Sequence, residues 1–187
     1  ERKGMSRRSF IRNVSLGAGA VAVAGLHGSP LQAAPIPKKW DMEADVVVVG
    51  YGGAGACAAI EAAKTGASAL LLEKTEVPGG STTLSGGIVY AANTKLQKST
   101  GITDSADAMY KYLMACGQGR AVPELVRVAS DMSAENIDWL ESLGCVFTKE
   151  LLAMSGMENE PEYKAVTPPQ KRGHRAKGTG SALFKAL

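Results

Sequence analysis

Cysteine and histidine are scarce in this sequence, and their scarcity excludes several kinds of site. The 187 residues contain three cysteines and two histidines. Cys57, Cys116 and Cys145 lie far apart, in no Cys-x-x-Cys pair and in no spacing typical of zinc. We therefore expect no metal site and no haem attachment within these residues. The three cysteines are expected to act as small structural side chains.

Neither sign of charge dominates once the first residues are set aside. Residues 1–34 hold five of the 21 basic side chains and one of the 18 acidic ones. The remaining 16 basic and 17 acidic side chains leave a net charge of −1. A nearly neutral body offers no electrostatic attraction for nucleic acid or anionic lipid, so neither is an expected partner.

The sequence also lacks a long apolar run. The uncharged stretch from Val14 to Leu26 is too short and too rich in glycine for a membrane-spanning helix, which needs about 20 residues. It follows the string Ser-Arg-Arg-Ser-Phe-Ile-Arg at 6–12 and precedes small residues near Ala33 and Ala34. This layout is typical of a cleaved export signal. An ordinary basic amphipathic start is the alternative.

The string at 6–12 closely resembles a twin-arginine signal. The resemblance implies that the protein is exported already folded, with the twin-arginine translocase as a partner and a periplasmic or other extracytoplasmic destination. Such a route suits a protein that acquires a tightly bound cofactor before export.

A dinucleotide-binding pattern follows this segment. Asp45 to Val49 is a β-branched run typical of a strand buried on both faces of a parallel sheet. The turn Gly-Tyr-Gly-Gly-Ala-Gly at 50–55 leads into a helix-forming stretch at 56–64, and a second strand at 69–72 ends at Glu73. This succession within about 30 residues predicts a Rossmann-like fold.

Each position of the pattern has a physical task. Gly50 allows a tight turn, Gly52 lets a pyrophosphate approach the backbone, and Gly55 lets the helix pack close to the sheet. The amino end of the helix offers free amides and partial positive charge to the phosphates. Glu73 can accept hydrogen bonds from the adenosine ribose, and its charge would repel the 2′-phosphate of NADP. A glycine-rich loop without function is the alternative.

The segment after Glu73 favours FAD over NAD. A small nicotinamide dehydrogenase would continue with a crossover helix, whereas this chain inserts a segment rich in glycine and hydroxyl groups at 75–87. Such a segment can run extended beside a long cofactor, with its amides and hydroxyls facing phosphate, ribityl chain and ring. The predicted cofactor-binding residues are Gly50, Gly52, Gly53, Ala54, Gly55, Glu73, Lys74, Gly79, Gly80, Ser81, Thr82, Ser85, Gly86 and Gly87.

These strings resemble the fumarate reductase and succinate dehydrogenase flavoprotein family, including its 3-ketosteroid dehydrogenase branch. The resemblance rests on Val-Val-Val-Val-Gly-Tyr-Gly-Gly-Ala-Gly, Leu-Leu-Leu-Glu-Lys, Pro-Gly-Gly-Ser-Thr and Leu-Ser-Gly-Gly, and it extends from about Lys39 to the end. It implies an FAD-dependent oxidoreductase that passes hydride from flavin N5 to the activated C=C bond of a fumarate-like unsaturated carboxylate. A ketosteroid desaturase is one alternative, and a non-catalytic flavin-binding fragment is another.

The resemblance also implies how the cofactor is held. In membrane-bound succinate dehydrogenases a histidine in this segment binds the flavin covalently, whereas Gly80 stands at the corresponding place here. FAD is therefore expected to be non-covalent. The family's catalytic residues lie far downstream, so no residue up to Leu187 is expected to be catalytic. A small-molecule substrate and a separate electron-donor protein are the implied partners.

Helices are predicted from Asp104 or Ser105 to about Gly117, from Pro123 to 132, at 137–143 and at 178–187, the first three with one buried face each. Residues 149–173 are polar and are predicted to form a loop. His174 lies between two arginines, which should lower its pKa. A loop contact near the pyrophosphate or a domain junction is preferred over a role as acid or ligand.

The predicted fold class is α/β, a Rossmann-like FAD-binding domain with a parallel sheet and flanking helices. The predicted segments are an export signal at 1–34, the amino-terminal part of the FAD-binding domain at 35–148, and a loop and helix at 149–187 that lead toward a substrate-capping domain. Most of that capping domain is expected beyond Leu187.

Overall fold

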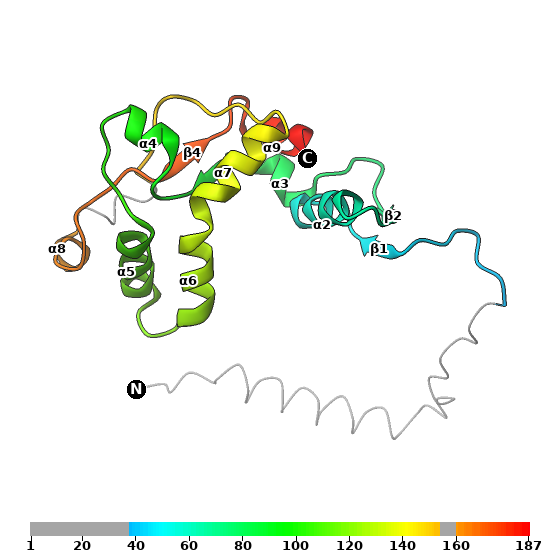
Figure 1. Ribbon diagram of the computed structural model, residues 1–187, viewed down its shortest axis with the longest axis horizontal. Coiled ribbons are helices and arrows are strands. Elements are labelled where there is room, and N and C mark those ends of the chain that lie inside the picture. The colour runs from blue at the N-terminus through cyan, green and yellow to red at the C-terminus, as the bar shows by residue number, and fades with distance from the viewer. Residues whose placement is uncertain (1–37, 154–159) are drawn as a thin grey trace, which may run out of the picture. The chain divides into compact units, whose positions relative to one another are not determined.

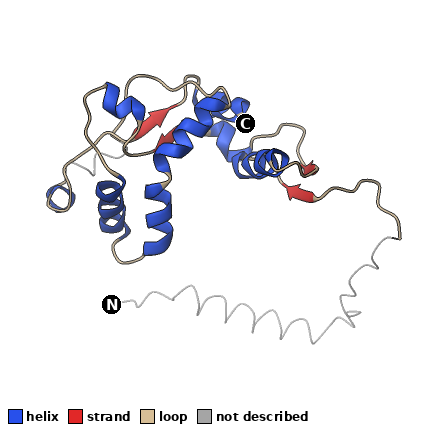
Figure 2. Cartoon of the chain, viewed as in Figure 1, coloured by secondary structure: helices blue, strands red, loops and turns tan. Residues whose placement is uncertain are grey.

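The computed structural model describes residues 38–153 and 160–187 (Figure 1). Residues 42–187 form one unit, which contains every helix and strand named below. Its helices are joined by loops and by a few short strands (Figure 2). The export signal predicted for 1–34 lies outside the described residues.

The predicted strand–helix–strand unit is present. Strand β1 (Val46–Val49) leads into helix α2 (Gly53–Lys64), and strand β2 (Ala69–Leu72) then pairs with β1 in parallel. Val46 lies opposite Ala69 and Val49 opposite Leu72, while α2 packs against both strands (Figure 1). Because parallel strands end at the same edge of a sheet, the glycine turn after β1 and Glu73 after β2 lie together.

The prediction that β1 is buried on both faces is wrong for the described residues. Val47 is exposed, and 84% of the surface of Val49 is accessible. The physical reason is that β1 and β2 alone form this sheet in the part of the chain that the structure describes, and α2 covers only one of its faces.

The glycine- and hydroxyl-rich segment is not extended throughout, which corrects the prediction for its centre. Helix α3 (Gly80–Leu84) begins after Gly79, whose φ of 109° lies in the left-handed region that favours glycine. The backbone turns sharply at this point and continues as a short helix. The segment therefore presents one helical turn where a continuous extended edge was expected.

Helix α9 (Thr179–Ala186) confirms the predicted helix near residue 187 and packs against α3. The contact is backbone to backbone: the amide of Gly180 donates to the Ser85 carbonyl at 3.0 Å. A Cβ at Gly180 would collide with the Thr82 carbonyl, so glycine at this position permits the close approach.

An antiparallel pair that the sequence did not predict joins distant parts of the chain. Strand β3 (Ile88–Tyr90) pairs with β4 (Gly173–Arg175), and Val89 lies opposite His174. The loop predicted for 149–173 also contains a short helix, α8 (Pro161–Lys164). Pro161 stands at N1, a position that proline favours at the start of a helix. The polar composition of the segment predicts a loop instead.

The helices between β3 and the loop are present where predicted, with α4 (Lys95–Ser99) as an addition. The first two agree in extent, whereas the third begins at Ser133, four residues before the predicted start. Helices α5 (Ala106–Gly117), α6 (Pro123–Asp131) and α7 (Ser133–Ser142) follow in order, and α6 contacts both α5 and α7 (Figure 1). Ser105, one of the two candidates, caps α5 by accepting a hydrogen bond from the Ala108 amide.

The predicted buried faces hold for two of these three helices. Met109 and Tyr112 of α5 and Ile137 of α7 are buried. Helix α6 differs, because its apolar side chains Leu125 and Val128 are 68% and 56% exposed. Its partly buried side faces α5 and α7, so apolar spacing correctly predicted the helix but not the cover over its apolar face.

A buried ion pair lies between β4 and the start of α5. Arg172 Nε and Nη2 donate to the two carboxylate oxygens of Asp104 at 2.7 and 2.8 Å, and both side chains are 0% exposed. Gln97 of α4 donates to the same carboxylate and to the Lys171 carbonyl, both at 3.0 Å. These contacts hold β4 against α4 and α5.

A small apolar core lies where β3, α7 and α9 meet. Leu140, Cys145 and Ala176 form its buried centre, and side chains of β3 and α9 pack around them.

Cys57 and Cys116 are half-buried, and all three cysteines are free. Within residues 38–153 and 160–187, no helix has the length and apolarity needed to cross a bilayer, and no group of three acidic, histidine or cysteine side chains could hold a metal ion.

Candidate cofactor-binding site

A cavity of about 380 Å³ opens at the carboxyl edge of the parallel strands. Val49 and Gly50 at the end of β1 line one side, and Leu72, Glu73 and Lys74 at the end of β2 line the other. Its lining is largely apolar, with one carboxylate among the strand ends. Such a cavity suits a flat apolar ring whose attached sugar reaches a hydrogen-bond acceptor.

Glu73 is held in place by the neighbouring backbone. The Tyr51 amide donates to Glu73 Oε2 at 2.8 Å, and the Thr75 amide donates to Oε1 at 2.9 Å. The Thr75 hydroxyl lies 2.8 Å from the same Oε1. These hydrogen bonds, with that from Tyr51 the largest cause, lower the pKa of Glu73 to about 2. The side chain is therefore an anion at neutral pH.

The glycine turn has the geometry that its sequence predicts. Gly50 has a φ of 100°, and its amide donates to the Leu72 carbonyl at 2.7 Å. A Cβ at Gly55 would collide with the Gly50 carbonyl, which confirms that this glycine lets α2 pack close to the strand. A Cβ at Gly52 would instead meet only the Gly79 carbonyl, at 3.9 Å. Packing does not demand glycine at 52, and the open space beside it fits a phosphate.

The amino end of α2 carries no acidic side chain in its first turn and no side-chain cap from Gly52. Thr82 of α3 supplies one acceptor, because the Gly53 amide donates to its hydroxyl oxygen at 3.1 Å. Gly79 also lies beside the turn, where its amide donates to the Tyr51 carbonyl at 2.6 Å. The structure thus brings residues 50–55, 73–74 and 79–82 together.

The last predicted residues of the segment have packing tasks. Ser85 Oγ donates to the Thr82 carbonyl at 2.8 Å and accepts from the Gly87 amide at 3.1 Å. Gly87 has a φ of 65°, and a Cβ there would collide with Thr179 of α9. Ser85, Gly86 and Gly87 therefore shape the turn between α3 and β3 against α9, while Gly80 and Ser81 are exposed.

Sequence reasoning missed several contributors to this site. Val49 and Leu72 line the cavity, and the Tyr51 amide and Thr75 bind Glu73. A signal for the first two was available, because the last residue of each parallel strand lies at the edge where α/β sheets bind ligands. No pattern in the sequence indicates that Thr75 turns back onto Glu73.

The position of His174 and the cause of its lowered pKa both differ from the prediction. It lies fully buried on β4, with Nε2 2.8 Å from the Thr94 hydroxyl and Nδ1 2.8 Å from the Arg172 carbonyl. A carbonyl can only accept, so Nδ1 carries the proton and Nε2 accepts from Thr94. Burial, not the neighbouring arginines, lowers the pKa of His174. The ring is a neutral structural group between β4 and the start of α4.

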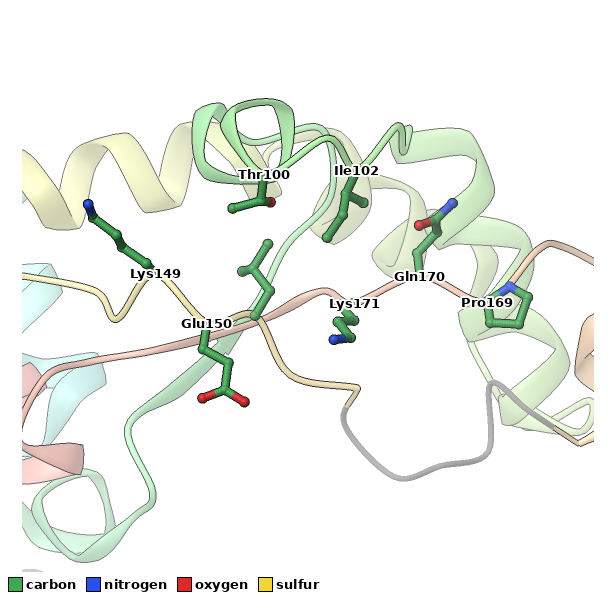
Figure 3. Close-up of a pocket in the computed structure, with 8 residues that line it drawn as sticks. Thr100, Ile102, Lys149, Glu150, Pro169, Gln170 and Lys171 are labelled. Carbon is green, nitrogen blue, oxygen red and sulfur yellow. The ribbon is translucent and has the colours of Figure 1, made fainter.

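A second cavity, of about 460 Å³, is lined by no residue of the glycine turn. Figure 3 shows its lining side chains. Thr100 and Ile102 line one side, and Lys149, Glu150 and Lys171 belong to the chain segments facing them. None of the predicted cofactor-binding residues lines it. The lysines here do not converge on a buried polar group, so the cavity at the strand ends is the candidate site.

Comparison with known proteins shows the family of this chain. The family model described as FAD binding domain matches residues 45–185. The chain belongs to this family. FAD is accordingly its cofactor, and the open glycine turn, the amino end of α2 and the anionic Glu73 fit the adenosine diphosphate part of that molecule.

The relatives include enzymes of two kinds. A 3-oxo-5-alpha-steroid 4-dehydrogenase of Comamonas testosteroni is 37% identical over 166 residues, covering 79% of this chain and 31% of the relative. A fumarate reductase (cytochrome) of Shewanella frigidimarina is 45% identical over 104 residues, covering 56% of this chain and 18% of the relative. These relatives are FAD-dependent oxidoreductases that act on C=C groups.

A solved structure shares the fold. The 3-ketosteroid-delta4-(5alpha)-dehydrogenase of Rhodococcus jostii, in complex with 4-androstene-3,17-dione, superposes with a TM-score of 0.75 and 37% identity. The match covers 80% of this chain and 36% of that one. The chain therefore spans about a third or less of the length of the relatives it matches.

Proposed function

We propose that this chain binds the adenosine diphosphate arm of FAD within an oxidoreductase that reduces an activated C=C bond of a fumarate-like unsaturated carboxylate. The observation that carries the proposal is Glu73, held by the Tyr51 amide at the mouth of the cavity between the ends of β1 and β2. FAD supplies the hydride chemistry when bound, and the residues of this chain bind and orient it.

Each part of the site has a distinct task in this proposal. The amides at the amino end of α2 bind the pyrophosphate, because the helix end carries partial positive charge and its first turn contains no acidic side chain. The open side of Gly52 admits the phosphate oxygens. Glu73 accepts the ribose hydroxyls, and its negative charge excludes a nucleotide with a 2′-phosphate.

The flavin is proposed to be non-covalent. The exposed Gly80 occupies the place where the resemblance indicated a covalent histidine, and His174 is buried on β4 with both ring nitrogens hydrogen-bonded. Retention of FAD would then depend on hydrogen bonds and packing. Denaturation in acid should release all bound flavin into the supernatant.

Binding of FAD to the purified chain tests the proposal directly. Flavin fluorescence should be quenched on titration, and Glu73→Gln should weaken FAD about 10- to 100-fold because hydrogen bonds to a charged acceptor are lost. Glu76→Gln is the matched control, since Glu76 is an exposed carboxylate three residues away that does not line the cavity. A chain that ignores FAD while taking up NAD would refute the proposal.

Desaturation of a ketosteroid is the second candidate. The steroid dehydrogenase relative matches 79% of this chain, against 56% for the fumarate reductase, and the superposed structure is also a ketosteroid dehydrogenase. The two are separated by assaying a full-length protein that contains this chain. Oxidation of reduced viologen by fumarate supports the first candidate, and reduction of a dye by a ketosteroid supports the second. Flavin binding without either turnover supports a non-catalytic flavin-binding role.

We also propose that residues 1–34 direct the folded protein to the twin-arginine translocase and an extracytoplasmic compartment. The support is the Ser-Arg-Arg-Ser-Phe-Ile-Arg string followed by a short apolar stretch. An exported reductase would receive electrons from a separate donor protein, which completes the proposed set of partners.

A further inference from the structure

Glu73 has almost no free acceptor capacity before a nucleotide binds. A carboxylate offers about four lone-pair positions. The Tyr51 amide takes one on Oε2, and the amide and hydroxyl of Thr75 take two on Oε1. The backbone amide of Lys74 also contacts the carboxylate. A ribose that donates both of its adjacent hydroxyls needs two positions, and at most one is left. At least one of the present donors must therefore leave when the sugar binds in this way.

Only one of these donors is free to move. The Tyr51 amide belongs to the glycine turn, which the Gly50 amide ties to Leu72 and the Tyr51 carbonyl ties to Gly79. The other amides are likewise part of the main chain. The Thr75 hydroxyl, in contrast, redirects its proton by rotation about a single bond.

This hydroxyl already has a second acceptor within reach. Thr75 Oγ1 lies 2.8 Å from Glu73 Oε1 and 3.0 Å from the Val77 carbonyl. One hydroxyl carries one proton, so it cannot donate to both. Bonds to a charged acceptor are the stronger ones, and donation to Glu73 is therefore favoured in the free protein. The proton can later turn to Val77 without leaving the hydroxyl unpaired.

We propose that Thr75 is a positioning residue of the nucleotide site, whose hydroxyl aims Glu73 into the cavity and passes its hydrogen bond to the Val77 carbonyl when a ribose diol takes Glu73 Oε1. This inference rests on the proposed function. It makes the site preorganised, because Glu73 is ordered before the ligand arrives and less conformational freedom is lost on binding. Thr75 itself needs no contact with the nucleotide.

Hydrogen bonding, and not a neighbouring charge, accounts for the lowered pKa of Glu73, so the loss of one hydrogen bond can be measured as a change in that pKa. Lys74 and Glu76 flank it on its own segment, and Tyr51 is the titratable group of the facing turn. The pKa of Glu73 is lowered by the Tyr51 amide, then by the amide and hydroxyl of Thr75 and least by the Lys74 amide, while burial opposes them; no charged side chain is among the causes. Removal of the Thr75 hydroxyl should therefore raise the pKa of Glu73.

Thr75→Val and Thr75→Ser form a matched pair, since valine keeps the shape and serine keeps the hydroxyl. The carboxyl carbon resonance of Glu73, identified by its loss in Glu73→Gln, is followed from pH 1 to pH 6 in the 187-residue chain, so that the range includes the wild-type midpoint near pH 2. We expect the midpoint to rise by about one pH unit in Thr75→Val and to stay with wild type in Thr75→Ser. Superposed curves for the two variants would overturn the inference.

The transfer to Val77 has its own readout. On saturation with FAD at pH 7, the Val77 carbonyl carbon resonance should shift in wild type and Thr75→Ser but not in Thr75→Val. The same shift in all three proteins would exclude the transfer. If wild type binds no FAD, the proposed function fails and the transfer fails with it, whereas the carboxyl titration still decides whether the hydroxyl holds Glu73. Far-ultraviolet circular dichroism verifies that each variant is folded.

Discussion

Replacement of Asp104 by asparagine should remove a large part of the stability of this chain. The substitution keeps the shape of the side chain but leaves the Arg172 guanidinium without a counter-charge, at a place where both side chains are 0% exposed. The new asparagine amide is itself a donor on one side. It would face one of the N–H groups of Arg172 or Gln97 that now donate to the carboxylate at 2.7 to 3.0 Å. Loss of one partner of a buried pair costs about 3–5 kcal/mol.

Arg172 cannot escape this cost by losing its proton. In wild type, burial lowers the pKa of Arg172, but the hydrogen bonds to Asp104 and Tyr90 outweigh burial and leave it above the ordinary value. In the variant, the guanidinium still keeps its proton because it is too basic to lose it in a folded protein. The rings of Tyr112 and Tyr90, with centroids 5.5 and 6.0 Å from the guanidinium carbon, still offer a cation–π contact in the variant. We therefore expect a loss near the lower end of the range, about 3 kcal/mol.

Urea unfolding followed by circular dichroism measures this effect. With a slope of about 2 kcal/mol per molar urea, the midpoint should fall by about 1.5 M. Asp107→Asn is the matched control, because the same change there affects exposed ion pairs with Lys111 and Arg127 and an exposed charge in the first turn of α5, which contribute little. The reasoning is refuted if Asp104→Asn and Asp107→Asn have the same midpoint.

Three further outcomes are expected. The free energy of unfolding should fall as the pH drops below about 6.5. The reason is that histidine in the unfolded chain takes up a proton there, while buried His174, with its lowered pKa, does not. Urea titrations at about pH 7.5 and about pH 5.5 measure this dependence, which His174→Gln should flatten. Gly55→Ala should lower thermal stability by about 1–3 kcal/mol through the collision with the Gly50 carbonyl, and an unchanged melting temperature would contradict the packing argument. A reporter fused to residues 1–34 should reach the periplasm, and lysine at both Arg7 and Arg8 should retain it in the cytoplasm; equal export of both fusions would exclude the twin-arginine route.

Local sequence patterns predicted the parts of the fold that depend on neighbouring residues. The run 45–49, the turn 50–55 and Glu73 gave a strand, a tight turn and an acid at the same edge because strand and helix periodicity, together with glycine geometry, act over a few residues. The same holds for α5, where Ser105 provides the start signal and the apolar spacing provides the buried face.

Long-range contacts account for what the sequence did not reveal. The strand at 88–90 is only three residues long and pairs with the strand at 173–175. Because both strands are short and far apart in the chain, no local pattern predicts either one. The sequence offers Asp104 as one of two candidate caps of α5, but its side chain binds Arg172, 68 residues away. In the site, no sequence pattern predicts that the Tyr51 amide and the Thr75 side chain bind Glu73, because these contacts depend on backbone geometry that turns both toward it.

The open face and unpaired edges of the sheet formed by β1 and β2 have a practical consequence for handling this chain. Each strand pairs on one side only in the described residues, and valine side chains on β1 are open to solvent. An apolar strand with an unpaired edge is a template for pairing with another molecule of the same kind. Concentrated samples should accordingly self-associate through this edge, and dilute samples are preferable for every titration that involves the neighbouring nucleotide cavity.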